Sequence, residues 1–478
     1  MVFSSLPFIF LFLPLNLLVY FFAKDIKQKN TVMLIFSLIF YAWGEPLYIL
    51  LLVGMAFADW YLTLIMSQYK KGSAKAKLFL GLTVGIDLIL LGIFKYGSFI
   101  LSNLKFFTGF PANVPSVMLP IGISFYTFQL ITYCVDVYRG DVLPQRSFKT
   151  LLLYVSLFHQ CIAGPIVRYK DVCAELENRR ATQIDIAEGI NRFTVGLAKK
   201  AIIANTCAAL ADTLLVPDGG DFSLLASKSA LSLWVGVLAF TLQIYIDFSA
   251  YSDMAIGMGK MIGIHYTENF DYPYISSSVS EFWRRWHITL GSFFRDYLYI
   301  PLGGSRRGKW RTVRNKLIVF FCTGLWHGAG WTYILWGLWH GVLVSGEGLL
   351  KAPIEKLRQK RGGRIVMHVY TLLAVILGFA MFRASSVQQG FLLIARMFSF
   401  AGAGAAGLLA AEEILTSARI AALVGGTVLS LPVVPALTRR CTGRGWEIVW
   451  NVLALLGLLA AILALSGGSF TPFIYQQF

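Results

Sequence analysis

Charged residues are scarce in this chain, and several familiar signatures of soluble enzymes are missing. Only 14% of its 478 residues are charged and 56% are hydrophobic, whereas a soluble domain carries about 25% charged residues. The six cysteines have no paired spacing, so neither a disulfide framework nor a cysteine-ligated metal site is expected. The sequence also lacks a His-x-x-x-His pair, a phosphate-binding glycine-rich loop and a Gly-x-Ser-x-Gly elbow. A zinc enzyme, an ATPase and a self-contained serine hydrolase are therefore unsupported.

Apolar runs recur along the whole length of the sequence. This pattern predicts an all-α, polytopic integral membrane protein rather than a soluble enzyme with one anchor. The first run, Leu6 to Ala23, follows no basic residues and contains no small-residue cleavage site. It therefore predicts a retained helix rather than a signal peptide. Counting these runs gives about eleven spans plus a few re-entrant segments. We interpret residues 1–478 as one transmembrane domain, with a catalytic core at about 119–350 and C-terminal helices with an aromatic tail at 365–478.

Two segments depart from the pattern of simple spans. Lys95 to Phe110 is too short and too mixed to cross a bilayer, and it predicts an aromatic helix at the membrane interface. Leu151 to Ala163 is apolar but ends at Gly164-Pro165, which predicts a re-entrant piece surrounded by protein. The remaining spans are expected over 6–23, 31–43, from the Pro46 turn to Met66, and over 78–94, 119–137, 190–215, 231–249, 365–382, 420–434 and 448–465. The span over 119–137 is expected to face protein rather than lipid because of its polar members, Ser124, Thr127, Gln129 and Thr132.

The net charge of +17 would suit a nucleic-acid partner, but its distribution argues otherwise. The basic residues fall in short runs between apolar segments, at 24–29, 70–77, 306–316 and 351–364. Such runs are typical of cytoplasmic loops, with some attraction to anionic lipid. We expect the last three of these loops on the cytoplasmic side, Pro46 and Phe478 outside, and the lipid bilayer rather than nucleic acid as partner.

Residues 324–341 form the most distinctive stretch, because the pentapeptide Gly-Leu-Trp-His-Gly occurs in it twice. Its histidines, His327 and His340, are its only proton-transfer groups, and an ionisable side chain among apolar residues is a functional-site hypothesis by default. On one continuous helix, thirteen residues would place the two rings roughly 140° apart around the axis. A helix break at Gly328–Gly330 would still separate them along the membrane normal. The two histidines are therefore not expected to serve one reaction centre.

Residues 281–304 are dense in aromatic, polar and charged groups. If they form one helix, Trp283, His287 and Gly291 share a face. Arg284 and Arg285 lie beside tryptophans close to the basic loop at 306–316. Guanidinium groups pair with phosphate and stack on rings, so this segment could hold a phosphorylated cofactor. Anchoring at the membrane interface explains the same composition, and spacing alone leaves both interpretations open.

The other polar residues in apolar surroundings favour structural roles. Asp247 and Asp253 could form a general acid–base pair, but pairing with an intramembrane arginine, or helix capping at Ser252 or Asp253, is the favoured interpretation. The isolated histidines are expected to be hydrogen-bonded structural residues. These are His159, His265 and His368.

Three segments, 282–287, 296–304 and 324–341, resemble the membrane-bound O-acyltransferase family, in particular the membrane subunit of bacterial alginate O-acetylation systems. Residues 163–166, 247–253 and 472–478 also fit. The resemblance implies a ring of tilted helices around a narrow funnel in the bacterial plasma membrane. It further implies an acyl donor on the cytoplasmic side and an acceptor outside. His327 matches the family's invariant histidine, and His287 matches its second hallmark position.

The implied activity is O-acetylation of an exported, alginate-like exopolysaccharide. We predict acetyl-CoA as donor substrate with no bound cofactor or metal, and a secreted or membrane-anchored SGNH-type protein as partner. His327 is predicted to be the base that activates the acceptor hydroxyl, and His287 to orient or polarise the acyl carbonyl. His340 is predicted to be a hydrogen-bonded structural residue whose replacement by alanine leaves measurable activity. The donor would be held by four neighbouring residues, Trp283, Arg284, Arg285 and Trp286.

Other acceptors remain open at this point, namely peptidoglycan, cellulose, or teichoic acid receiving D-alanine. A polysaccharide transporter is an alternative from a different class, but it should show internal repeats with charges at the membrane midplane. Apart from the doubled pentapeptide, no repeat is evident. A neighbouring gene for an SGNH-type protein would favour polysaccharide acetylation, and one for a D-alanyl carrier protein would favour the teichoic acid route.

Overall fold

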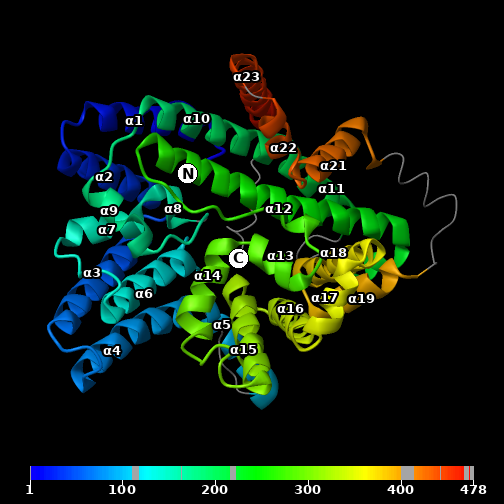
Figure 1. Ribbon diagram of the computed structural model, residues 1–478, viewed down its shortest axis with the longest axis horizontal. Coiled ribbons are helices and arrows are strands. Elements are labelled where there is room, and N and C mark those ends of the chain that lie inside the picture. The colour runs from blue at the N-terminus through cyan, green and yellow to red at the C-terminus, as the bar shows by residue number, and fades with distance from the viewer. Residues whose placement is uncertain are drawn as a thin grey trace. The chain divides into compact units, whose positions relative to one another are not determined.

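The computed structural model describes residues 2–109, 118–162, 164–215, 222–399, 414–441, 443–467 and 473. These residues form helices and no strands, which confirms the predicted all-α class (Figure 1). They group into two compact units, built mainly from Met1–Thr194 with Tyr251–Glu268 and from Val195–Ala250 with Asn269–Ile474. The predicted ring around a funnel concerns the placement of these units and stays a prediction. Of the predicted aromatic tail, only Phe473 lies within the described residues.

The helices of the first unit begin at the N-terminus and run to the middle of α10. Their bounds are η1 Phe8–Phe12, α1 Leu13–Phe22, α2 Ile26–Gly44, α3 Tyr48–Ser67, α4 Ala74–Leu91, η2 Gly92–Tyr96, α5 Gly97–Thr108, α6 Ile123–Arg139, α7 Phe148–Ser156, α8 Phe158–Cys161, α9 Tyr169–Glu177 and α10 Gln183–Ala198. The C-terminal part of α12 also belongs to this unit.

The second unit contains the remaining helices and all of the predicted site residues. Their bounds are η3 Lys199–Ala204, α11 Asn205–Leu214, η4 Phe222–Ser227, α12 Ala230–Met261, η5 Pro273–Ile275, α13 Val279–Arg285, α14 Ile288–Phe294, η6 Arg295–Tyr299, α15 Lys309–His327, α16 Trp331–Leu349, α17 Lys351–Gln359, α18 Arg361–Arg383, α19 Val387–Met397, α21 Ser417–Leu429, α22 Val433–Arg440 and α23 Arg444–Gly467.

Within the described residues, six helical segments are long and apolar enough to cross a membrane. They are Tyr48–Ser67, Ala74–Thr108, Gln183–Leu214, Ala230–Met261, Arg361–Arg383 and Gly445–Gly467. The pair α21 and α22, bent by 62°, would make a seventh. The predicted total of about eleven is not confirmed, partly because the expected spans at 6–23 and 119–137 form helices of fewer than 18 residues. Several apolar helices nevertheless establish a polytopic membrane protein.

The helix predicted over 95–110 is not separate from the preceding span in its described part, and its location at the membrane interface stays a prediction. The backbone continues as one helical segment of 35 residues from Ala74 to Thr108, because the π-helical turn η2 carries the hydrogen bonding past Gly92. Lys95 is buried in this segment and donates a hydrogen bond from Nζ to Ser124 Oγ at 3.1 Å. This hydrogen bond gives the lysine a polar partner inside the protein.

Two other predictions about the first unit agree with the structure. The polar side chains of α6 are buried in protein, as expected; they are Ser124, Thr127, Gln129 and Thr132. The segment predicted to be re-entrant forms α7 and α8, of nine and four residues, with a break at Leu157. Neither piece is long enough to cross a bilayer, and Leu151 to Ile162 are all buried.

Candidate active site

The doubled pentapeptide folds into a helical hairpin rather than one helix. Helix α15 ends at His327, and α16 begins at Trp331. The break falls at Gly328, where the backbone is extended and an added Cβ would lie 2.3 Å from the ring of Tyr333. A residue larger than glycine would therefore displace that ring. Of the two alternatives that the sequence left open, a continuous helix and a break at Gly328–Gly330, the structure has the break, and it places His327 at the last position of its helix.

The first glycine of each pentapeptide-bearing helix lets α15 and α16 pack backbone to backbone. An added Cβ would lie 2.4 Å from Tyr333 O at Gly324, and 2.3 Å from Phe320 O at Gly337. Real side chains essentially never approach so closely, so both positions require glycine for this crossing. The two helices consequently lie side by side (Figure 1), and this fixes the directions of His327 and of the α16 side chains.

His287 lies at a sharp break between α13 and α14, so the single helix predicted through 281–291 is wrong. Its backbone is left-handed, with φ 44° and ψ 55°, a conformation that costs a residue other than glycine roughly 1–3 kcal/mol. Asn269 holds this turn. Its backbone oxygen accepts from Ile288 N at 2.9 Å, and its side-chain Oδ1 lies 3.0 Å from His287 Nδ1.

The contact with Asn269 also fixes the tautomer of His287. Thr289 donates two hydrogen bonds to Asn269 Oδ1, from its hydroxyl at 2.9 Å and from its backbone N–H at 3.4 Å. Because an N–H group only donates, the side-chain atom of Asn269 that it contacts is the amide oxygen. Because an amide oxygen only accepts, His287 Nδ1 carries the proton. His287 lies outside the candidate membrane-spanning helices, and burial lowers its pKa to about 3. The ring is therefore neutral at physiological pH, with the lone pair on Nε2.

Both predicted catalytic histidines belong to one buried aromatic cluster. His287 and His327 are 1% and 2% exposed. The ring of Trp326 links them, with centroids 5.7 Å from His287 and 4.9 Å from His327. On its other side, His327 contacts Trp336 at 4.9 Å. The sequence predicted that two histidines 40 positions apart share a site. In the structure they are linked through the ring of Trp326.

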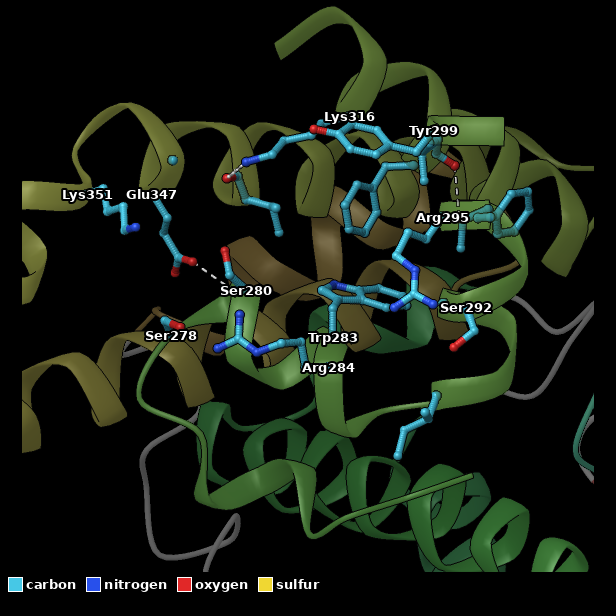
Figure 2. Close-up of a pocket in the computed structure, with 18 of the residues that line it drawn as sticks. Ser278, Ser280, Trp283, Arg284, Ser292, Arg295, Tyr299, Lys316, Glu347 and Lys351 are labelled. Carbon is cyan, nitrogen blue, oxygen red and sulfur yellow. Dashed lines mark hydrogen bonds between the residues drawn. The ribbon is translucent and has the colours of Figure 1, made fainter. Parts of the chain in front are cut away.

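A cavity of about 770 Å³ lies beside this cluster and is lined by α13, α14, η6, α15, α16 and α17 (Figure 2). Its size is within the range of small-molecule sites, roughly 300–1,000 Å³. Trp283 and Arg284 line it from α13. Basic side chains also line it from other elements, namely Arg295, Lys316, Lys351 and Arg358. Two carboxylates, Glu347 and Glu355, line it as well, so basic side chains outnumber acidic ones and the lining favours an anionic ligand.

The four residues predicted to hold a donor divide into two pairs. Trp283 and Arg284 line the cavity, and Arg284 is exposed and has no acidic or hydrogen-bonding partner within the described part of the chain. Trp286 does not line the cavity. It is 1% exposed and stacks on Phe282 with centroids 5.4 Å apart. Arg285 is likewise outside the cavity lining, so adjacent residues in the sequence have different surroundings.

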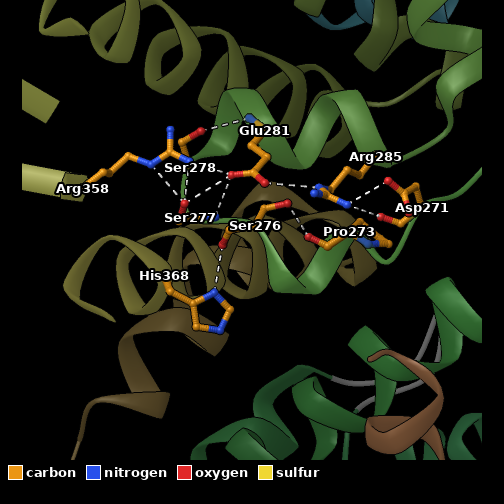
Figure 3. Close-up of polar contacts among 9 residues, drawn as sticks. All are labelled: Asp271, Pro273, Ser276, Ser277, Ser278, Glu281, Arg285, Arg358 and His368. Carbon is orange, nitrogen blue, oxygen red and sulfur yellow. Dashed lines mark hydrogen bonds and ion pairs between the residues drawn. The ribbon is translucent and has the colours of Figure 1, made fainter. Parts of the chain in front are cut away.

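Arg285 belongs to a network of ion pairs around Glu281 (Figure 3). Arg285 donates to Glu281 Oε1 at 3.2 Å and to Asp271 Oδ2 at 2.8 Å. Arg358 of α17 donates to Glu281 Oε2 at 2.9 Å. Burial acts to raise the pKa of Glu281, but the backbone N–H of Ser277 and the two arginines outweigh it and hold the pKa below its usual range. The network ties α17 to α13 along one side of the cavity.

Two residues that position the site were missed by sequence reasoning. Glu347 of α16 accepts the backbone N–H groups of Val279 and Ser280, at 2.7 and 2.8 Å, and so holds the start of α13. Glu347 could have been recognised from the sequence, because a carboxylate within an otherwise apolar helix indicates a functional or structural role. Asn269 holds His287 but lies 18 residues earlier in a loop, and no local pattern marks it.

The structure corrects the expected roles of the two aspartates in α12. Both lie inside this helix, so Ser252 and Asp253 cap nothing. Asp253 pairs with Arg192 at 3.0 Å, as predicted for an arginine partner. Asp247 instead pairs with Lys200 of η3 at 2.7 Å, and both side chains are 2% exposed. Each carboxylate is thus the partner of a basic side chain, which favours a structural role over a general acid–base pair.

The isolated histidines form hydrogen bonds, as predicted. His265 Nδ1 lies 2.8 Å from Glu175 Oε1, His368 Nδ1 lies 2.9 Å from Ser276 O, and His159 Nδ1 lies 3.4 Å from Tyr266 Oη. His340 does not follow this prediction. It is fully buried, yet neither ring nitrogen has a hydrogen-bond partner among the residues that the structure describes. In the same residues, no group of three metal-ligating side chains occurs.

Comparison with known proteins identifies the family of this chain. The model of the membrane-bound O-acyltransferase family matches residues 141–388. The chain is 39% identical, over all of both sequences, to a probable alginate O-acetylase from Pseudomonas putida. It is 34% identical to a peptidoglycan O-acetyltransferase from Helicobacter pylori, over 84% of this chain and 80% of that protein. A teichoic acid D-alanyltransferase from Bacillus subtilis is 27% identical over 55% of this chain and 68% of its own length. The chain therefore belongs to the membrane-bound O-acyltransferase family, and is a multi-pass membrane enzyme that uses an acyl donor as substrate.

Proposed function

We propose that this enzyme takes an acetyl group from acetyl-CoA on the cytoplasmic side and delivers it for O-acetylation of an exported, alginate-like polysaccharide. The observation that carries the proposal is the pair of buried histidines, His287 and His327, joined through Trp326 beside a cation-lined cavity. The full-length similarity to the Pseudomonas putida protein favours this acceptor. A secreted or membrane-anchored SGNH-type partner would receive the acetyl group or present the polymer.

The proposed reaction needs one base and one leaving group. His327 removes the proton from the acceptor hydroxyl as the oxygen attacks the thioester carbonyl. A C–O bond forms, the C–S bond breaks, and the proton passes from His327 to the departing thiolate. His287 is neutral, with its lone pair on Nε2. The sequence predicted that His287 orients or polarises the acyl carbonyl, which would require a proton on Nε2. Because this tautomer has none there, we assign His287 instead to orientation of the acceptor hydroxyl.

The donor would lie in the cavity with its phosphates toward the basic side chains. Lys351 and Arg358 in the cavity wall belong to the basic run at 351–364 that is expected on the cytoplasmic side. Arg284 is the best phosphate ligand on α13, because its guanidinium is not engaged by a carboxylate within the described residues, and guanidinium binds phosphate through paired hydrogen bonds. We therefore assign donor binding to Trp283 and Arg284, and assign Arg285 and Trp286 to support of α13.

Substitution of the two adjacent arginines tests the donor assignment. Arg284→Ala is expected to raise the KM for acetyl-CoA about ten-fold, since a hydrogen bond to a charged group contributes about 1.5–3 kcal/mol. Arg285→Ala is the matched control, and should lower thermal stability while leaving that KM within about two-fold. Both are measured as initial rates of [14C]acetyl transfer in membrane vesicles. Equal KM values for both variants and the wild type would contradict the assignment of the cavity.

The acceptor is tested in cells that carry or lack the gene for this chain. The proposal expects acetyl esters on the exported polysaccharide to disappear with the gene, as measured by proton NMR of the purified polymer. Peptidoglycan and teichoic acid from the same cultures serve as controls and should keep their ester content. Loss of esters from peptidoglycan alone would instead assign the function suggested by the Helicobacter pylori relative.

A further inference from the structure

Three side chains between the cavity and His327 form a triangle of mutually contacting rings. The ring centroids of Trp283 and Trp336 are 5.6 Å apart, those of Trp283 and His340 are 5.3 Å apart, and those of Trp336 and His340 are 5.2 Å apart. His340 is 0% exposed and Trp336 is 1% exposed. The three rings, which together carry four nitrogen atoms, therefore form one contact cluster.

None of these nitrogens is satisfied within the part of the chain that the structure describes. Trp283 Nε1, Trp336 Nε1 and both ring nitrogens of His340 are buried and have no hydrogen-bond partner there. A buried polar group without a hydrogen bond is destabilising, and such groups in native proteins call for an explanation such as a catalytic role. Packing alone does not supply one, because phenylalanine would fill the same aromatic positions without that cost.

The position of the triangle connects it to the proposed reaction. One face of Trp283 lines the cavity (Figure 2), and Trp336 contacts His327 with centroids 4.9 Å apart. His340 Nε2 faces Gly378 of α18, where an added Cβ would lie 2.9 Å from that nitrogen and 3.4 Å from Trp336 Cδ1. The glycine keeps a side chain away from the polar edges of both rings. The triangle therefore connects a ring that lines the cavity to a ring that contacts His327.

The chemistry of the triangle suits a hydrogen-bond acceptor. The indole N–H group only donates, so Trp283 and Trp336 supply two donors, and neutral His340 supplies a third. The acyl carbonyl oxygen gains negative charge as the acceptor oxygen attacks, and it needs donors aimed at that position. His287 cannot provide one in its neutral form, because its ring proton is directed to Asn269. The donors must then come from other residues.

We propose that Trp283, Trp336 and His340 bind the carbonyl oxygen of the acyl thioester and stabilise the oxyanion that forms on it. This inference rests on the proposed function for the identity of the donor. The carbonyl oxygen becomes an oxyanion when the C–O bond forms, and the carbonyl is restored when the C–S bond breaks. The ring nitrogens exchange no proton in this step. His340 thereby acquires a catalytic role, in place of the structural role expected from the sequence.

His340→Phe tests the proposal, because phenylalanine keeps the aromatic packing and removes both nitrogens. We expect kcat for [14C]acetyl transfer to fall about 100-fold, as for removal of one oxyanion donor, with the KM for acetyl-CoA within about two-fold. His340→Gln, which restores an N–H donor, should recover part of the loss. Trp336→Phe should lower kcat in the same way, and Trp286→Phe, at a buried tryptophan outside the triangle, serves as the control. All variants are compared at equal amounts of folded protein in membrane vesicles.

Two outcomes would overturn the inference without affecting the proposed function. One is a His340→Phe variant with wild-type kcat. The other is a decrease in kcat that matches the decrease in thermal stability in both variants, His340→Phe and His340→Gln. That result would assign the residue to packing. Failure of the proposed function would look different, because the wild-type chain itself would then transfer no label from acetyl-CoA.

Discussion

Replacement of His327 by alanine is expected to abolish acetylation of the exported polymer, while the protein still inserts and remains stable. The imidazole is 2% exposed at the end of α15 and lies between Trp326 and Trp336, each 4.9 Å from its centroid. As the proposed general base it contributes a factor of about 10²–10⁴ to the rate. The measurement is the acetyl ester content of the polymer, together with the rate of [14C]acetyl transfer in vesicles.

His265→Ala is the matched control for this experiment. That histidine is 52% exposed and pairs with Glu175 in the other compact unit, so its loss should leave acetylation close to normal. Expression and thermal unfolding of the two variants should be alike. Near-normal acetylation by His327→Ala at equal protein levels would show that the proposed mechanism is wrong.

The second large effect concerns the buried ion pair between Lys200 and Asp247. The two side chains are 2.7 Å apart and 2% exposed, and Lys200 Nζ also lies 4.5 Å from the ring centroid of Phe473. Lys200→Met should lower the free energy of unfolding by about 3–5 kcal/mol, because it leaves a buried carboxylate without its cation. The result is measured as the midpoint of thermal unfolding and the yield of folded protein in detergent.

Removal of both charges distinguishes a structural pair from a catalytic one. In Lys200→Met with Asp247→Leu no charge remains unpaired, so much of the lost stability should return, since apolar replacement of a buried pair is often neutral or stabilising. Acetylation should return with it. A stable double variant that transfers no acetyl group would contradict the structural assignment and would indicate a catalytic role for Asp247.

Features that depend on neighbouring residues could be predicted from the sequence. The glycines at 328–330 raised a helix break after His327 as one of two alternatives, and the structure has it. The polar residues of α6 predicted a helix buried in protein, and this prediction is confirmed. By contrast, the left-handed turn at His287 depends on hydrogen bonds to Asn269, 18 residues earlier. Helix periodicity contains no information about such a contact, so the segment 281–291 was predicted as one helix.

The division of the donor-site residues could not be predicted for the same reason. Arg284 and Arg285 are neighbours with the same chemistry, and only the positions of Glu281, Asp271 and the cavity distinguish them. His340 shows the limit most clearly. Its 140° separation from His327 was calculated for a continuous helix, whereas the hairpin places both rings against Trp336. Sequence identified the residue types of the site, and three-dimensional packing decides which of them work together.

The close backbone contact between Gly324 and Gly337 also bears on the order in which the enzyme is built. These glycines are 13 residues apart, and Asn269 and Glu347, which hold the rest of the site, lie in the same stretch of the chain. Contacts between residues close in sequence form quickly, because little loop entropy is lost in making them. The hairpin is thus able to form as soon as α16 has been synthesised. The catalytic centre would then be an early, locally encoded module, and changes in the helices outside residues 269–349 would alter what reaches it more readily than how it is assembled.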